Sequence, residues 1–169
     1  MRVQNSNTNE LAREMRNWVV RFLYENDEAE LRIGQVCNEA NASPTVIYKY
    51  FGSRQGLIDA ALMEVFKDAC NNIVKSFDEL ADYVVANSEP HLVFAEICHE
   101  PSRFQSICDH RATQFRVLGS TIPRPSTHGR VLDLYEEFER KIRAPLLRIA
   151  GAGAFHPDWE LSEILGILM

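Results

Sequence analysis

The sequence predicts an all-α protein, and three observations support that fold class. Apolar residues recur at helical spacing, i, i+3, i+4 and i+7, along most of the 169-residue chain. No segment alternates apolar and polar residues as a half-buried strand does. The chain is 46% hydrophobic and 25% charged, which is ordinary for a globular protein and sufficient to bury a core. We therefore expect one bilobal helical domain or two small ones.

The first predicted helix covers residues 11–23, where apolar side chains recur at i, i+4, i+7, i+8, i+11 and i+12. The polar residues 1–9 before it are predicted to form a flexible arm. Polar residues also cluster at positions 25–27, and this cluster predicts the end of the helix.

Two short helices are predicted next. Residues 33–40 have the apolar pattern of the first of these two helices, and this pattern stops at residues 41–43. Ser43 and Pro44 predict the start of the second, because serine caps free amides and proline is favoured in the first helical position. The inward face of this second helix is predicted to hold Val46, Ile47, Tyr50 and Phe51. Its outward face presents Thr45, Tyr48, Lys49 and Gly52.

A long connecting helix follows. Gly52 predicts the end of the preceding helix, and Ser53 is a suitable cap for the next one. The connecting helix is predicted over about residues 53–75. Its apolar pattern is weakened at residues 71–72, where two asparagines stand, and then resumes to residue 84.

The second half of the chain is predicted to be helical with two interruptions. Residues 119–129 contain two prolines and are predicted to form a long mobile loop. Pro145 is expected to kink or break the helix that contains it. The last helix, from Asp158, is still apolar at Met169, so we expect either that the given sequence stops within this helix or that a second copy covers it in a dimer. The other helices in this half are predicted over residues 92–97, 104–118 and 131–149.

The residues from 31 to 62 form the arrangement of a helix-turn-helix, in which a second short helix presents a polar face to DNA. The net charge is −6, yet residues 41–56 contain two cations and no Asp or Glu. A helix with small outward side chains fits into the major groove, where its hydroxyl, phenol and ammonium groups can bind phosphates and base edges. Ser43 and Ser53 at helix N-termini, and the Arg54 guanidinium, are expected to bind phosphates. The predicted DNA-contacting residues are Arg32, Ser43, Thr45, Tyr48, Lys49, Ser53 and Arg54.

This part of the chain resembles the N-terminal domain of TetR-family repressors. The motif is RIGQVCNEANASPTVIYKYFGSRQGL, residues 32–57, and the similarity extends over about residues 10–66. Gly34 stands where the family usually has alanine, Asn41 and Ala42 replace Gly-Val, and Arg54 replaces lysine. Arginine keeps the charge, and asparagine tolerates a left-handed backbone almost as glycine does. The residues kept at the family spacing are Ile47, Tyr48, Tyr50, Phe51, Ser53 and Leu57.

The resemblance implies a DNA-binding domain over residues 10–56 and a helical effector-binding and dimerisation domain over residues 57–169. In such a protein a small-molecule effector shifts the connecting helix and releases a homodimer from double-stranded operator DNA. The candidate effector contacts mix aromatic and polar side chains: Phe94, Cys98, His99, Phe104, Cys108, Phe115 and Tyr135.

Two other functions are compatible with the sequence. One is a TetR-like DNA-binding protein that has no effector and is controlled by a protein partner. The other is a hydrolase or metal-dependent enzyme that uses Cys98, His99 or His110. Adjacent residues on a helix point about 100° apart, so Cys98 and His99 do not chelate a metal readily, and neither do residues 108–110. We expect no enzymatic activity, no metal and no cofactor.

The expected location is the cytoplasm, without a membrane partner. No apolar run approaches the ~18 residues of a membrane span, and the N-terminus lacks the apolar core of a signal peptide. The four cysteines are widely separated, which predicts reduced thiols.

Overall fold

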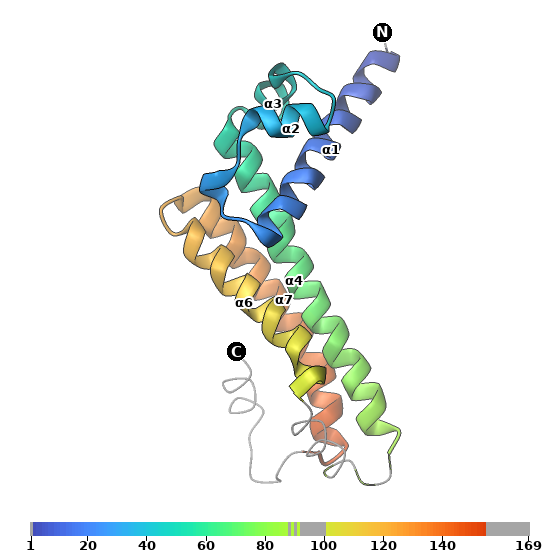
Figure 1. Ribbon diagram of the computed structural model, residues 1–169. Coiled ribbons are helices and arrows are strands. Elements are labelled where there is room, and N and C mark those ends of the chain that lie inside the picture. Colours follow the sequence, from blue (N-terminus) through green and yellow to red (C-terminus); the bar gives the residue numbers. More distant parts are fainter. Residues whose placement is uncertain (1, 88, 90, 92–100, 155–169) are drawn as a thin grey trace.

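Helices make up all the regular structure in the described part of the chain. The computed structural model describes residues 2–87, 89, 91 and 101–154. Over these residues it contains helices and no strand, so the predicted all-α class is confirmed there. Figure 1 shows α4 running the length of the molecule, with α1–α3 at one end of it and α6 and α7 beside its other part. The helices predicted over residues 92–97 and after Asp158 lie outside the described residues.

The first helix is longer than predicted. α1 (Arg2–Glu25) is already helical at Arg2, so the expected flexible arm over residues 1–9 is wrong for residues 2–9. These residues include no proline or glycine, and nothing therefore interrupts the hydrogen-bond ladder that extends from the apolar part. Met15, Val19 and Leu23 are buried, as their spacing predicts.

The next elements are short, and α2 and α3 end within one residue of their predicted ends. A 3₁₀ turn, η1 (Glu28–Glu30), connects α1 to α2 (Ile33–Glu39). α3 (Pro44–Phe51) begins with Pro44 in its first turn and ends at Gly52, whose φ is +75°. Only glycine adopts this backbone region without steric cost, which explains why the helix stops there. We call α1–α3 the head.

The connecting helix is continuous. α4 (Arg54–Val85) has 32 residues and runs past Asn71 and Asn72 without a break. Both asparagines are exposed, so their side chains are solvated while the buried face continues on the other side. The core side of α4 includes Leu57, Ala61, Val65, Phe66, Ile73 and Ala81.

The second half differs from the prediction at its loop. α6 (Pro101–Thr121) and α7 (Pro125–Gly151) leave only residues 122–124 between them, so the long mobile loop expected over residues 119–129 is wrong. Pro125 lies in the first turn of α7, where its missing N–H costs nothing. The helix also continues across Pro145, which is buried in the core. Burial of its ring opposes the cost of the hydrogen bond that proline removes.

The core is organised around α4. This helix packs against α1 and α3 at the head and against α6 and α7 in the body, by which we mean α4, α6 and α7 together. Buried side chains from all these helices form one cluster. Among the described residues, no helix has an apolar stretch long enough to span a bilayer.

Candidate nucleic-acid interface

The turn between α2 and α3 has the tight geometry that a helix-turn-helix requires. Asn41 adopts a left-handed backbone with φ of +46°, a conformation that asparagine tolerates almost as glycine does. The amide of Ala42 then donates to the carbonyl of Cys37 over 2.9 Å. This hydrogen bond terminates α2 and fixes the direction in which the chain enters α3.

α3 separates an anchoring face from an exposed face. Val46 and Ile47 are buried against the head, as predicted. Tyr48 is 62% exposed, and Thr45 and Lys49 on the same side are also exposed. An eight-residue helix held only by its inner face leaves these three side chains available to a partner.

Two of the predicted DNA-contacting residues in the head are exposed cations, Arg32 and Lys49. The Lys49 ammonium stands 5.1 Å from the centroid of the Tyr50 ring, and this contact limits its range of positions. Arg32 precedes the first residue of α2 and is exposed. Both residues are exposed, and their contact with phosphate or a base edge stays a prediction.

The two serines predicted to hold phosphates behave differently. Ser43 precedes α3, is exposed and makes no capping hydrogen bond. The Ser53 hydroxyl oxygen accepts a hydrogen bond from the amide of Gly56 over 2.9 Å. Ser53 therefore caps α4 with its hydroxyl oxygen, and its O–H group remains able to donate a hydrogen bond to a phosphate.

Arg54 has a structural partner that its sequence position does not reveal. Its Nη2 atom donates to the backbone carbonyl of Glu28 over 2.8 Å and to that of Leu31 over 3.1 Å. The side chain is partly buried. The guanidinium thus fastens the connection between α1 and α2 to the start of α4, and its expected contact with backbone phosphate competes with these bonds.

Gly56 is a second residue whose role the sequence does not reveal. A Cβ atom at this position would lie 1.9 Å from the backbone oxygen of Phe51. Such a contact is far inside the sum of the van der Waals radii, so α4 can start this close to the end of α3 only with glycine. Gly56 therefore sets the spacing between α3 and α4.

Arg124 joins the body to the head. Its guanidinium pairs with the carboxylate of Asp59 at 2.8 Å and with that of Glu28 at 3.0 Å, and its side chain is 15% exposed. The Thr127 hydroxyl donates to the other oxygen of Asp59 over 2.9 Å. Because Glu28 belongs to η1 and Asp59 to α4, one side chain after α6 holds three segments together. We call this group the junction.

The predicted effector contacts are not brought together by the described residues. Phe94, Cys98 and His99 lie outside the described residues, as does the side chain of Phe104. Cys108 is exposed and Phe115 is 55% exposed on α6. The Tyr135 ring instead packs between Phe66 and Phe138, with centroids 6.5 Å and 5.9 Å away. The described residues therefore do not form a pocket from Cys108, Phe115 and Tyr135, because spacing along the sequence does not determine which way each helix faces, and the effector contacts stay a prediction.

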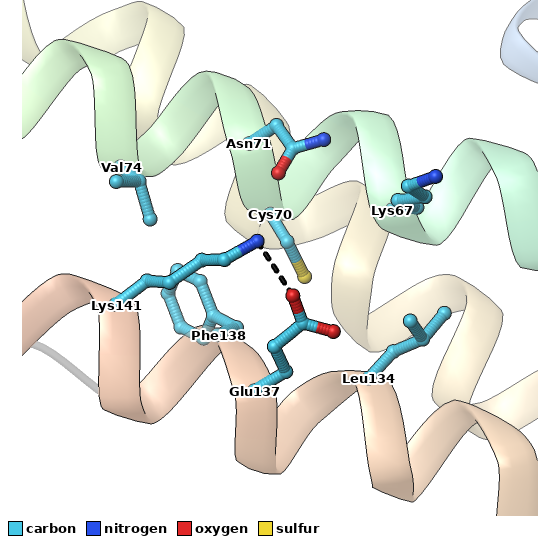
Figure 2. A pocket seen from close by; sticks show the side chains of 8 residues that line it. All are labelled: Lys67, Cys70, Asn71, Val74, Leu134, Glu137, Phe138 and Lys141. Atoms are coloured by element: carbon cyan, nitrogen blue, oxygen red, sulfur yellow. Dashed lines mark ion pairs between the residues drawn. The ribbon is translucent and has the colours of Figure 1, made fainter.

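A different hollow lies between α4 and α7. Figure 2 shows Glu137 and Lys141 of α7 pointing across it toward Cys70 and Asn71 of α4. The Glu137 carboxylate pairs with the Lys141 ammonium at 2.6 Å, and this contact lowers the pKa of Glu137. The cavity volume is about 20 Å³, room for one water and far below the ~300 Å³ of a small-molecule pocket.

Thiol and metal chemistry find little support in this region. Burial raises the pKa of the Cys70 thiol to about 11, which keeps the group protonated and unreactive at neutral pH. Within residues 2–87 and 101–154, no three His, Cys, Asp or Glu side chains gather as a metal site. His110, the third residue named for an enzymatic function, is half-buried on α6.

Comparison of this chain with protein-family models, with curated proteins and with solved structures finds no match.

Proposed function

We propose that this protein is a DNA-binding transcriptional regulator whose α3 helix enters the major groove of its operator. The observation that carries this proposal is the exposed face of α3, where Tyr48 is 62% exposed beside Thr45 and Lys49. The same helix is anchored by Val46 and Ile47. To enter the major groove, a helix needs an inner face that is firmly packed and an outer face of polar side chains that are not bulky.

Charge supports the same assignment. The whole chain has a net charge of −6, which would repel DNA over most of its surface. The stretch from residue 41 to residue 56 has no acidic side chain and contains the cations Lys49 and Arg54. The surface that contains α3 therefore repels phosphate less than the acidic parts of the chain do.

The second half of the proposal is that a small-molecule effector releases the protein from its operator DNA. A homodimer places two heads on half-sites about 34 Å apart, so a small change in head separation abolishes simultaneous binding. The junction gives the body a direct connection to the head, because Arg124 bonds to Glu28 as well as to Asp59. A small-molecule effector that alters α6 or α7 would act on the head through this connection.

A binding experiment with matched tyrosine variants tests the proposal. DNA sequences are selected from a random pool, the enriched site is measured by gel shift, and Tyr48→Ala is compared with Tyr83→Ala. Tyr83 is also exposed but lies toward the far end of α4. We expect specific binding that Tyr48→Ala weakens by about tenfold and Tyr83→Ala leaves unchanged. Failure to bind any sequence better than random DNA at physiological salt would refute the proposal.

A further inference from the structure

One side of α7 exposes two leucines with charged side chains between them. Leu132 is 43% exposed and Leu147 is 50% exposed. The two lie about 22 Å apart along the helix axis. Three exposed charged residues and the half-buried Glu139 lie between them, and all six positions fall within an arc of about 100° around the helix. We call these residues the α7 face: Leu132, Glu136, Glu139, Arg140, Arg143 and Leu147.

Charge is segregated along α7. Residues 131–139 contain four acidic side chains and no cation, and residues 140–151 contain four cations and no acidic side chain. Acidic residues at the start of a helix and cations at its end interact favourably with the helix dipole, but this effect is confined to the first and last turns. The sign of the charge changes at Glu139 and Arg140, in the middle of the helix. The helix dipole therefore does not account for the arrangement.

None of the four charged side chains of the α7 face forms an ion pair with another described side chain. Their spacing would allow pairs within the helix, because Glu136 and Glu139 each precede an arginine by one turn. The same spacing is used elsewhere on α7, where Glu137 pairs with Lys141 on the side that faces α4 (Figure 2). The charges of the α7 face are therefore available to a partner.

The α7 face is complementary to its own reversed copy. Counted outward from the midpoint between the two central residues, each member of the face has its complement at the same distance on the other side. A two-fold axis through this midpoint would bring each residue onto its complement in a second copy of the chain. The three complementary pairs are Glu139 with Arg140, Glu136 with Arg143, and Leu132 with Leu147.

We propose that two copies of the chain associate through their α7 faces, with the two helices antiparallel. The ion pairs lie at the centre of this contact, and one leucine contact closes each end. A parallel arrangement would set Glu136 of one copy beside Glu136 of the other, and like charges in contact oppose association. An unrelated protein would have to carry the same charges in reversed order, which a second copy provides by symmetry.

The antiparallel pair places the two heads at opposite ends. Arg124, directly before α7, pairs with Glu28 at the head, whereas Arg148 near the other end of α7 pairs with Asp82 toward the far end of α4 (Figure 1). In the pair, the starts of the two α7 helices are therefore about 40 Å apart and point away from each other. This arrangement does not present both heads to neighbouring half-sites on one face of DNA. The contact is thus distinct from the homodimer proposed to bind operator DNA, and it does not depend on DNA binding.

The size of the contact sets its expected strength. A single helix pair about 22 Å long buries less surface than the ~1,600 Å² that is standard for specific complexes. We therefore expect association in the micromolar range. Because its centre consists of ion pairs near solvent, the association should weaken as salt is added.

Charge reversal tests the pairing, with association measured by analytical ultracentrifugation at low salt. Glu136→Arg places arginine opposite arginine, and Arg143→Glu places glutamate opposite glutamate. Each variant alone should therefore associate at least about tenfold more weakly than the unaltered chain. An equimolar mixture of the two variants restores opposite charges in both pairs and should recover the association.

The matched control is Arg130→Glu, which makes the same change of charge at an exposed position of α7 outside the α7 face. It should leave the association unchanged. The proposal is overturned if the mixture associates no more strongly than either variant alone, or if Arg130→Glu weakens association as much as Arg143→Glu does. It is also overturned if the unaltered chain shows no association through this face at about 100 μM.

A disulfide measures the register of the two helices directly. In a background with Cys98→Ser and Cys108→Ser, a chain with Leu132→Cys is mixed with a chain with Leu147→Cys under mild oxidation. A bond should join the two chains, because these positions lie opposite each other in the antiparallel pair. Neither variant alone should form it, since identical positions of the two copies are about 22 Å apart. Absence of the bond in the mixture, or its formation by either variant alone, contradicts the proposal.

Discussion

The Arg124 guanidinium lies 3.0 Å from the carboxylate of Glu28, a residue 96 positions earlier in the chain. The same segment is held from a second side by Arg54, which donates to the Glu28 carbonyl. Two arginines, one at the start of α4 and one in the connection between α6 and α7, therefore hold the connection between α1 and α2.

Removing the Arg124 side chain should destabilise the fold. In Arg124→Ala the carboxylates of Glu28 and Asp59 lose their shared cation in a partly buried place, and we expect a loss of about 2 kcal/mol in the free energy of unfolding. Urea denaturation monitored by circular dichroism measures it. A double-mutant cycle with Glu28→Gln should give a coupling energy of about 1 kcal/mol.

The control for this prediction is Arg148, which pairs with Asp82 and Asp78 on the surface of α4. All three side chains are exposed, so water and salt screen the pairs, and Arg148→Ala should cost less than about 1 kcal/mol. Equal losses for Arg124→Ala and Arg148→Ala would show that burial of the junction is without energetic effect.

Lys49 and Arg54 should separate DNA contact from head stability. Lys49 is exposed, so Lys49→Ala should lower the slope of log K against log salt by about one unit and leave unfolding unchanged. The Nη2 atom of Arg54 donates hydrogen bonds to two backbone carbonyls, so Arg54→Ala should lower the free energy of unfolding by about 1 kcal/mol or more. Filter binding across a salt series and urea denaturation give the two readouts. An Arg54→Ala protein with full stability and a reduced salt slope would restore the original prediction of a phosphate contact.

Gly56→Ala should be strongly destabilising, although alanine is the better helix former. The added Cβ would approach the Phe51 oxygen to 1.9 Å, and the start of α4 must shift away from α3. We expect a loss of about 2–3 kcal/mol and weaker DNA binding. The matched control is Gly34→Ala in α2, where nothing lies within 4 Å and a gain of about 0.5–1 kcal/mol is expected. Thermal denaturation of both variants decides this, and a stabilised Gly56→Ala protein would contradict the geometry.

Cys70 should make stability fall in alkaline solution. Burial raises its thiol pKa from an ordinary value of 9.0 to about 11, so the unfolded chain loses this proton at lower pH than the folded protein. The unfolded state then binds fewer protons between pH 9 and pH 11, and the free energy of unfolding decreases as the pH rises through that window. Urea denaturation at pH 8, 9 and 10 should show a shallower decline for Cys70→Ala than for the unaltered chain. Identical declines would mean that the thiol does not contribute.

α3 and the turn before it could be predicted from the sequence, because their signals are local. Proline in the first turn of α3, glycine after its last residue and asparagine in the turn before it each act through their own backbone geometry. Burial of Val46 and Ile47 and exposure of Tyr48 follow from the same helical period. DNA contact itself stays a prediction.

Other features were decided by residues that are distant in the sequence. Thr127 is buried and bonded to Asp59, 68 positions away, and so belongs to a helix instead of the predicted loop. Arg54 turns toward carbonyls 23 and 26 positions earlier. Tyr135 faces Phe66 instead of the predicted effector pocket. Periodicity shows that a helix has an apolar face, but the choice of the element that covers this face depends on contacts between segments that only the folded chain brings together.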